Sequence, residues 1–315
     1  MIQVDNLKKN YFASNKKRGS GISRFAGIGK HKGLSFDVNK GEIFGVIGPD
    51  GAGKSTLFRI LASLLLPDSG TASLDGKNVV KDYKHVRKII GYMPGRFSLY
   101  QDLSVEENLT FFATVFNTTI EENYDLIKDI YSQIEPFKTR RAGNLSGGMK
   151  QKLALSCALI HKPKVLILDE PTTGVDPVSR KEFWDMLGRL RDQDITIIVS
   201  TAYMDEASRC DRIALMLDGD FIAVNSPQGI IDDYKEELWA VQADNMSGSL
   251  IDVRKYEDVK SCFAFGDKHH ITIKEGFSKE KLYNYLSEKG YKDIIIEKAT
   301  PTVEDCFLAL AEENV

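Results

Sequence analysis

The 315-residue sequence predicts an α/β fold: a mostly parallel sheet with a phosphate-binding loop, a helical subdomain and a small α+β domain near the C-terminal end. Two observations lead to this prediction. Apolar runs typical of buried strands alternate with segments whose apolar residues recur at helical spacing, and this alternation builds a parallel sheet. One such run leads directly into a glycine-rich loop and then a helical pattern, which is the context that a phosphate-binding loop requires.

Composition limits the classes of function. With 42% apolar residues the chain can bury a sizeable core, and a formal charge of −3 gives no basic field that would favour nucleic acid. No N-terminal run resembles a signal peptide, and no apolar stretch reaches the ~18 residues of a spanning helix, so we expect any work at a membrane to depend on docking to another chain. Four cysteines without metal-ligand spacing are expected to be small buried hydrophobes in a reducing compartment: Cys157, Cys210, Cys262 and Cys306.

The N-terminal third carries the elements expected around the glycine-rich loop. Alternation over 34–38 predicts a half-buried strand, and the apolar run 42–47 predicts a fully buried one. A further strand is expected at 89–93. Directly after the loop, apolar residues at helical spacing predict a helix: Leu57, Ile60, Leu61 and Leu64.

The middle of the chain continues the alternation. Residues 104–160 are expected to be mostly helical, within a helical subdomain over about 84–160. Strands are expected at 164–168, 195–200 and 212–217 with helices between them, which favours a mostly parallel sheet. One helix face is expected to be buried, at Leu153, Ser156, Cys157 and Ile160.

A change in composition at 225–227 divides the chain into a large domain, 1–225, and a small one, 226–315. In the small domain, short alternating stretches mix with helical segments, which predicts an α+β domain; the stretches are 251–253, 270–273 and 293–297. Thr300 and Pro301 are expected to cap its last helix. The first turn of that helix is expected to carry Glu304 and Asp305, and its buried stripe Val303, Phe307 and Leu310.

The segment 14–32 is basic and contains no acid. The favoured interpretation is a surface insertion. The alternative is a contact with anionic lipid head groups or with an acidic partner loop. Its cationic residues are Lys16, Lys17, Arg18, Arg24, Lys30 and Lys32.

The segment 48–55 fits the pattern GxxxxGK[ST]. Its glycines let consecutive backbone N–H groups converge on phosphate oxygens, and the following helix adds the partial positive charge of its N-terminus. Lys54 is expected to reach the β- and γ-phosphates, and Ser55 to offer its hydroxyl oxygen to Mg²⁺. The alternative, a strand-to-helix turn without a ligand, is disfavoured because strand and helix both lie where needed. The expected nucleotide-binding residues are Gly48, Pro49, Asp50, Gly51, Ala52, Gly53, Lys54, Ser55 and Thr56.

A second apolar run, 165–168, delivers two acids to the exposed end of its strand. Asp169 is expected to hold Mg²⁺ through water. Glu170 is expected to orient or deprotonate the attacking water, and Lys54 is its partner in catalysis. Adjacent acids at a strand end can simply be solvated, but the phosphate loop upstream favours the functional interpretation.

Between these motifs lies Leu145-Ser146-Gly147-Gly148-Met149, a polar turn that opens a helix. With the three motifs in this order, residues 1–225 resemble the ATP-binding subunit of an ABC transporter, which implies a P-loop NTPase core of the ABC ATPase type. In that family the turn closes over the γ-phosphate held by the opposite subunit, so the resemblance assigns Ser146, Gly147 and Gly148 to nucleotide binding.

The resemblance extends to other positions. Asp176 matches the acid of the family's loop that crosses the dimer interface, and Tyr11 matches the aromatic that stacks on adenine, with simple packing as the alternative. The segment 300–310 is similar to the closing segment of exporter-type subunits that move drugs, lipids or polysaccharides. The resemblance implies ATP and Mg²⁺ as ligands, a second ATPase subunit (identical or different), a transmembrane permease subunit, and a cytoplasmic location at the inner face of the membrane.

Two positions depart from the family pattern. Gly95 stands where the family has a glutamine that touches Mg²⁺ and the attacking water. Ala202 stands where it has a histidine that bonds the γ-phosphate, and Tyr203 is not expected to replace it, because neighbouring side chains in an extended segment point apart. The chain's own site is therefore expected to bind ATP and to hydrolyse it slowly unless a different subunit completes it.

Two functions remain in view. The favoured one is a transport ATPase in which ATP closes two subunits and hydrolysis reopens them. The alternative is a nucleotide-gated clamp in a non-transport assembly. In the first case, the loop after Gly95 is expected to face the permease, with internal packing of the helical subdomain as the other interpretation; its residues are Arg96, Phe97, Leu99 and Tyr100.

Overall fold

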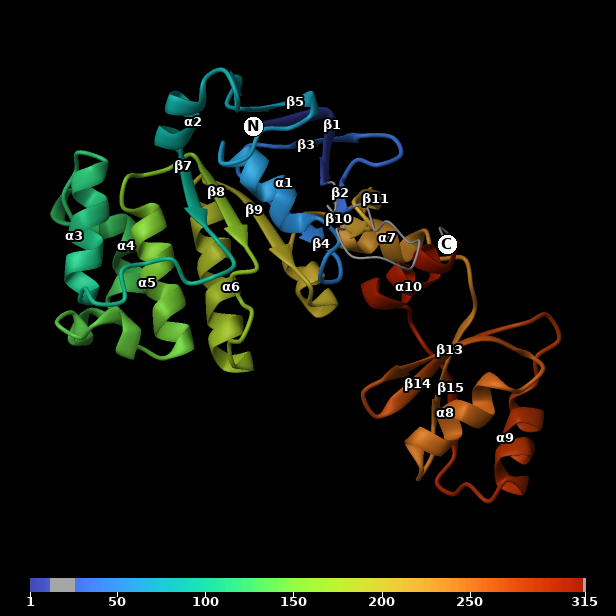
Figure 1. Ribbon diagram of the computed structural model, residues 1–315. Coiled ribbons are helices and arrows are strands. Elements are labelled where there is room, and N and C mark those ends of the chain that lie inside the picture. Colours follow the sequence, from blue (N-terminus) through green and yellow to red (C-terminus); the bar gives the residue numbers. More distant parts are fainter. Residues whose placement is uncertain (12–25, 314–315) are drawn as a thin grey trace, which may run out of the picture. The chain divides into compact units, whose positions relative to one another are not determined.

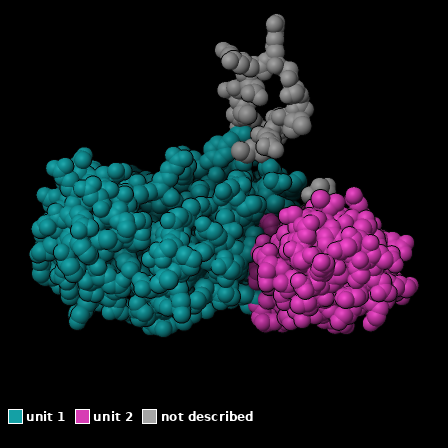
Figure 2. All heavy atoms as spheres, turned by 90° about the horizontal axis from the view of Figure 1, so that it is seen from below, with its two compact units in different colours: residues 1–227 teal, residues 228–315 magenta. Residues whose placement is uncertain are grey.

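The structure, a computed structural model, describes residues 1–11 and 26–313. It contains two compact units, residues 1–227 and residues 228–315 (Figure 2). Each unit has a hydrophobic core of its own. The greater part of the basic segment expected over 14–32 lies outside the described residues; its described end contributes a short strand at 26–28 and the exposed Lys32.

The first unit contains all the strands up to β11 and the helices up to α6 (Figure 1). Its strands are β1 (Ile2–Tyr11), β2 (Ala26–Ile28), β3 (Leu34–Val38), β4 (Ile43–Ile47), β5 (Ser69–Leu74), β6 (Lys77–Asn78), β7 (Ile90–Met93), β8 (Val165–Asp169), β9 (Thr196–Thr201), β10 (Arg212–Leu217) and β11 (Asp220–Asn225). Its α-helices are α1 (Lys54–Leu61), α2 (Tyr83–Ile89), α3 (Val105–Val115), α4 (Tyr124–Tyr131), α5 (Gly147–Leu159) and α6 (Pro177–Arg191).

A six-stranded sheet in the order β11-β10-β4-β9-β8-β7 forms the centre of this unit. Five of its strands are parallel, and the edge strand β11 pairs antiparallel with β10. Every residue of β4 and β8 is buried, as expected for strands covered on both faces. These observations confirm the predicted α/β fold. They also place β7, which lies inside the range 84–160 expected for the helical subdomain, at the edge of the sheet.

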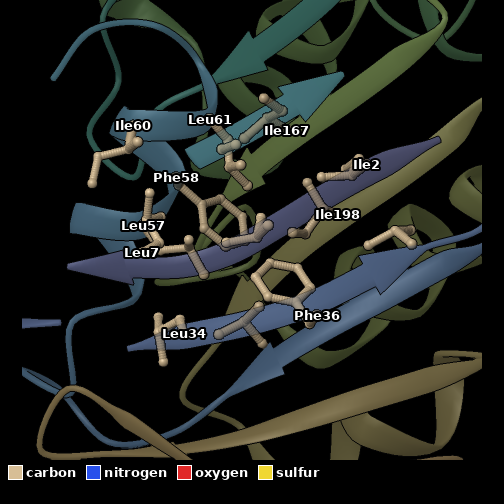
Figure 3. Close-up of a cluster of buried hydrophobic side chains, with 14 of the residues drawn as sticks. Ile2, Leu7, Leu34, Phe36, Leu57, Phe58, Ile60, Leu61, Ile167 and Ile198 are labelled. Carbon is tan, nitrogen blue, oxygen red and sulfur yellow. The ribbon is translucent and has the colours of Figure 1, made fainter. Parts of the chain in front are cut away.

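A second, antiparallel sheet runs in the order β2-β1-β5-β6, and β3 also pairs with β1. Helix α1 contacts both β5 of this sheet and β8 of the central sheet. A hydrophobic core lies around α1, where Leu57 and Phe58 meet Ile2 and Phe36 (Figure 3). Because Phe58 is fully buried, Phe58→Ala is expected to cost about 3–5 kcal/mol of stability. The core thus fixes the helix that follows the glycine-rich loop.

Helices cover the remaining surfaces of the central sheet. Helix α6 contacts β4 and β9 and buries Phe183, Trp184 and Leu187. Helices α3, α4 and α5 pack together as a helical lobe, and α5 joins this lobe to β7 (Figure 1). The lobe begins at a capping box, in which Ser104 and Glu107 satisfy each other's backbone N–H groups at the start of α3.

Most of the expected elements of the first unit are confirmed, including the buried face of α5. The expected helix after the glycine-rich loop is wrong at its end. Ser63 adopts a left-handed backbone with φ +57°, so α1 stops at Leu61, and Leu64 lies beyond it with 55% of its surface exposed. The four cysteines are free and buried, as expected.

The second unit has a four-stranded antiparallel sheet in the order β13-β14-β12-β15. Helices α8 and α9 pack on it around Val253, Ile271 and Leu282, which is the α+β organisation that the sequence predicts. Its strands are β12 (Leu238–Gln242), β13 (Val259–Phe265), β14 (Lys268–Ile273) and β15 (Ile295–Lys298). Its helices are α7 (Pro227–Asp232), which starts at the boundary, α8 (Met246–Arg254), α9 (Lys279–Glu288) and α10 (Val303–Glu313).

Three expectations for this unit differ from the structure. The stretch 251–253 belongs to helix α8 and not to a strand, because three alternating residues also fit one helical turn. The cap of α10 is Thr302 rather than Thr300 and Pro301: the Thr302 hydroxyl accepts from the Asp305 amide, and the Asp305 carboxylate accepts from the Thr302 amide. Leu310, expected in the buried stripe, is only half-buried.

Candidate nucleotide and metal site

The glycine-rich loop joins the end of β4 to the start of α1. Two of its residues need backbone angles that favour glycine, since Gly51 has φ +83° and Gly53 has φ +110°. A Cβ atom built on Gly51 meets no atom within 4 Å, so this side of the loop is open. The loop therefore has the form of a cradle at the N-terminus of a buried helix, which suits phosphate oxygens.

Lys54 lies under this loop with only 3% of its side chain exposed. Its Nζ donates to the carbonyl oxygens of Gly48 at 2.7 Å and Pro49 at 3.0 Å. The same Nζ forms an ion pair with Oε1 of Glu170 at 3.1 Å. The structure thus brings together the two residues that the sequence assigns to catalysis.

Ser55, at the end of the glycine-rich motif, is in contact with Asp169 at the end of β8. The Ser55 hydroxyl donates to Oδ1 of Asp169 at 3.0 Å. A hydroxyl and a carboxylate oxygen are the hard ligands that Mg²⁺ takes when substrate phosphates supply others, so this pair fits the ion. Across residues 1–11 and 26–313, no group of three or more His, Cys, Asp and Glu side chains could hold a metal.

The strand end that carries the two acids is less exposed than the sequence suggests. Asp169 is the last residue of β8 and is buried, and 23% of the Glu170 side chain is exposed. Glu170 has a left-handed backbone with φ +49°. Its amide donates to the carbonyl oxygen of Ser200 at 3.1 Å and to the Ser200 hydroxyl at 2.9 Å. These bonds, together with the ion pair to Lys54, direct the carboxylate toward the phosphate cradle.

Tyr11 ends β1 beside the first turn of α1. The Thr56 hydroxyl donates to its phenol oxygen over a long 3.5 Å, and 37% of Tyr11 is exposed. An exposed aromatic ring at the mouth of the cradle can stack on a base, as the sequence suggests.

The Ser146 turn opens α5. Ser146 is the N-cap, and its hydroxyl accepts from the Met149 amide at 3.4 Å. Gly147 and Gly148 form the first turn, and a Cβ atom on Gly148 would lie 3.1 Å from the Ser179 hydroxyl of α6. Glycine thus lets the tip of α5 approach α6 closely and leaves the helix N-terminus uncrowded.

Asp176 caps the neighbouring helix. Its Oδ1 accepts from the amides of Val178 at 3.1 Å and Ser179 at 3.0 Å. The hydrogen bond from the Ser179 amide is the main reason that the pKa of Asp176 lies below its ordinary value. The expected interface acid is therefore also a structural cap of α6.

Position 95 lies against the two acids. A Cβ atom on Gly95 would come within 3.1 Å of the Asp169 carbonyl oxygen and 3.7 Å of the Glu170 Cβ. A cavity of about 1060 Å³ runs from Asp169 and Glu170 past Gly95 to residues of the helical lobe, among them Phe116 and His161. A side chain at position 95 would enter this space, so glycine leaves it open beside the acids.

Ala202 follows the end of β9 and is half-buried. Tyr203 turns its ring beneath the Arg180 guanidinium, 4.4 Å from the ring centroid. This contact holds the Tyr203 ring against α6.

Two functional candidates escaped the sequence analysis. Ser200 touches both acids through its hydroxyl. Glu206, only 4% exposed, accepts from the hydroxyls of Thr172 at 3.0 Å and Thr201 at 2.6 Å and so ties the loop after β8 to the loop after β9. The sequence gives one indication of these two residues: polar side chains occur at the end of the apolar run 195–200 and beyond it.

Comparisons with known proteins agree with this geometry. A family model described as ABC transporter matches residues 31–173. The Nod factor export ATP-binding protein I of Burkholderia lata is 40% identical over 289 residues, which cover 88% of this chain and 90% of that protein. The chain belongs to the ABC transporter family. It carries the ATP-binding cassette with which this family hydrolyses ATP.

Another relative is the probable multidrug ABC transporter ATP-binding protein YbhF of Escherichia coli, 36% identical over 293 residues. The match covers 91% of this chain, which spans about half the length of that relative. Among solved structures, a dimeric post-hydrolysis state of the ATP-binding cassette MJ0796 bound to ADP and Pi superposes with a TM-score of 0.60 and 25% identity, covering 72% of this chain and 98% of that one. Over the described ranges 1–11 and 26–313, the structure has no helix long and apolar enough to cross a bilayer.

Proposed function

We propose that this ABC-family chain is the ATP-binding and ATP-hydrolysing subunit of an exporter, powered by closure of two cassettes on ATP. The contact of Lys54 with Glu170, next to the Ser55–Asp169 pair, carries the proposal. These residues meet at the carboxyl ends of β4 and β8, where parallel α/β sheets place their ligands. Two relatives are named a multidrug transporter ATP-binding protein and a Nod factor export ATP-binding protein, which supports export.

The residues divide the chemistry of hydrolysis among themselves. Backbone N–H groups of the loop and the Lys54 ammonium balance the charge of the β- and γ-phosphates. Glu170 orients a water molecule for attack on the γ-phosphorus and takes up its proton as the bond to the ADP oxygen breaks. Mg²⁺, when held by Ser55 and Asp169, neutralises phosphate charge.

A second cassette completes the site. Ser146 caps a helix N-terminus that is free of bulky side chains, which suits a donor for a γ-phosphate held on another chain. Asp176 lies next to this turn, at the cap of α6. The dimeric state of the similar MJ0796 cassette supports this arrangement. We propose that Ser146, Gly147, Gly148 and Asp176 act across such an interface.

The chain's own site is slow in this proposal. Gly95, two residues after the end of β7, and Ala202, directly after the end of β9, offer no polar side chain. Loss of one preorganised donor typically lowers the rate ~10²–10³-fold. A different cassette subunit with both donors therefore makes the better partner. Turnover of the chain mixed with such a subunit should exceed the sum of the two alone; equally brisk turnover by this chain alone would rule out the asymmetry.

A membrane permease is the proposed docking partner, which would place the chain at the inner face of the cell membrane. The loop after Gly95 is the candidate contact. Leu99 is buried and so belongs to internal packing, whereas Arg96 is exposed and Tyr100, 51% exposed, packs edge-on against the exposed Phe111 of α3. An exposed aromatic pair, with an exposed arginine in the same loop, suits a partner helix.

The missing donors at positions 95 and 202 also favour the second candidate, a nucleotide-gated clamp with little turnover. The Mg²⁺-dependent ATPase rate of the purified chain, compared with Lys54→Ala, tests the proposed function. We expect Lys54→Ala to lower ATP affinity and turnover at least tenfold, and the control Lys40→Ala, on an exposed lysine that pairs with Asp194, to change neither. Identical rates for wild type and Lys54→Ala would overturn ATP hydrolysis at this site.

A further inference from the structure

We propose that Ser200 is a positioning residue for hydrolysis, whose hydroxyl holds both the Asp169 carboxylate and the backbone of Glu170. The inference deepens the proposed function and rests on it. Ser200 lies near the end of β9, beside Asp169 on one neighbouring strand and Val46 on the other. It is fully buried between the strand that leads into the glycine-rich loop and the strand that carries the acids.

The Ser200 hydroxyl makes two hydrogen bonds with opposite roles. It donates to Oδ1 of Asp169 at 2.8 Å and accepts from the Glu170 amide at 2.9 Å. A serine hydroxyl has one hydrogen and two lone pairs, so both bonds form at once. One oxygen atom therefore links the expected metal ligand to the expected water-orienting residue.

The contact with Glu170 acts on a residue in an uncommon backbone conformation. With φ +49°, Glu170 is in the left-handed region that only small or specially bonded residues occupy readily. Because backbone angles set the direction in which the side chain leaves the chain, the bonds to the Glu170 amide also set the position of its carboxylate. Ser200 supplies both acceptors of that amide, its carbonyl oxygen and its hydroxyl.

The contact with Asp169 acts on an oxygen that Ser55 shares. Oδ1 accepts from the Ser55 hydroxyl at 3.0 Å and from Ser200 at 2.8 Å. Ser55 belongs to α1 and is itself an expected metal ligand, whereas Ser200 belongs to the rigid centre of the sheet. Ser200 thus orients the Asp169 carboxylate from the neighbouring strand β9. At a site without polar side chains at positions 95 and 202, the placement of these two acids carries more of the catalysis.

The matched pair Ser200→Thr and Ser200→Val tests this role. Threonine and valine have the same branched shape at this buried position, and only threonine keeps the hydroxyl. We expect Ser200→Val, relative to Ser200→Thr, to lower kcat at saturating Mg²⁺-ATP at least tenfold, as for the loss of a hydrogen bond to a charged group. Ser200→Ala, which removes the hydroxyl and adds no volume, should match Ser200→Val.

Nucleotide binding gives a second measurement, independent of turnover. A fluorescent ATP analogue is titrated into each purified full-length variant with EDTA and with Mg²⁺, and thermal unfolding is recorded without ligand. We expect equal affinities in EDTA, and a gain in affinity on adding Mg²⁺ that is about tenfold smaller for Ser200→Val and Ser200→Ala than for Ser200→Thr and wild type. Equal kcat and equal Mg²⁺ gains for Ser200→Ala and wild type would overturn the positioning role. Equal rates for wild type and Lys54→Ala would instead overturn the proposed function.

Discussion

At Gly95 a Cβ atom would come within 3.1 Å of the Asp169 carbonyl oxygen. A contact this short requires the loop to move by a few tenths of an ångström, and the exposed loop after β7 can do so more readily than the strand β8. A longer side chain at position 95 would then reach into the cavity beside Glu170. Glycine at position 95 therefore provides no polar side chain beside the two acids. It also avoids a close contact with the Asp169 carbonyl oxygen.

Adding polar side chains at positions 95 and 202 tests whether their absence slows hydrolysis. We expect Gly95→Gln combined with Ala202→His to raise the Mg²⁺-dependent kcat about tenfold or more, because each side chain adds a polar group next to the γ-phosphate. The two effects need not add, since they act on one transition state. The control is Gly95→Met combined with Ala202→Phe, which adds bulk without such donors. An unchanged kcat in the Gln/His variant, with ATP still bound, would contradict the proposed effect of positions 95 and 202.

The residues of the site differ in how far the sequence alone predicts them. Lys54 and Ser55 belong to a motif of fixed spacing, and Asp169 and Glu170 end an apolar strand, so local patterns find them. Ser200 and Glu206 act across strands that are far apart in the sequence, and no spacing rule marks them. Their roles follow from strand register, which requires the folded sheet.

At the scale of elements, α6 depends on its cap. We expect Asp176→Ala to lower the Tm by several degrees, because the amides of Val178 and Ser179 lose their acceptor. Asp176→Asn keeps an acceptor oxygen and should leave the Tm nearly unchanged. If Asp176 is also an interface acid, both variants should weaken ATP-dependent association. An equal drop in Tm for Asn and Ala would argue against the cap.

Stability should also depend on pH through His161. This ring stacks on Phe116 with centroids 3.7 Å apart, and its Nε2 lies 2.8 Å from the Ile90 carbonyl oxygen, so it joins the helical lobe to β7. Burial lowers the pKa of His161 below its ordinary value of 6.5. The unfolded chain thus binds a proton at a higher pH than the folded one, and stability is lost as the pH falls from about 6.5 through the folded pKa.

Urea unfolding at pH 7.5 and pH 5.5 checks this expectation. We expect the free energy of unfolding to fall with pH in the wild type and to fall less in His161→Gln, which keeps a polar side chain without a titrating ring. His269, buried in the second unit with a lowered pKa, contributes a separate loss and remains in both proteins. The same pH dependence in wild type and His161→Gln would contradict the assignment.

The elements show where sequence reasoning stops. The five parallel strands of the central sheet are predicted within one or two residues, because continuous apolar runs are strong local signals, whereas the edge strand β11 is not predicted. The pairing of β1 with β3 and β5 is not predicted, because it joins segments that are not adjacent in sequence and local patterns do not encode such pairing. The end of α1 is missed because Leu64 keeps the helical spacing after Ser63 has already reversed the backbone.

At the scale of the whole molecule, one core surrounds α1 and another lies under α8 and α9. The nucleotide site draws all its residues from the first unit. It has two parts, the cradle at Lys54 and the turn at Ser146. In a dimer, the cradle of one chain and the turn of the other would contact opposite faces of one bound ATP. The central claim is therefore that ATP joins this cassette to a second one.

The mass of the Glu170→Gln variant in solution, measured by light scattering with Mg²⁺-ATP, tests this claim most directly. Without Glu170 as a base, ATP should persist in the site. We therefore expect a two-chain complex that requires ATP and forms with an identical or a companion cassette. Adding Ser146→Arg, which blocks the helix tip, should abolish the complex. A single-chain mass with Mg²⁺-ATP, both alone and with each companion cassette, would show that ATP does not join this cassette to a second one.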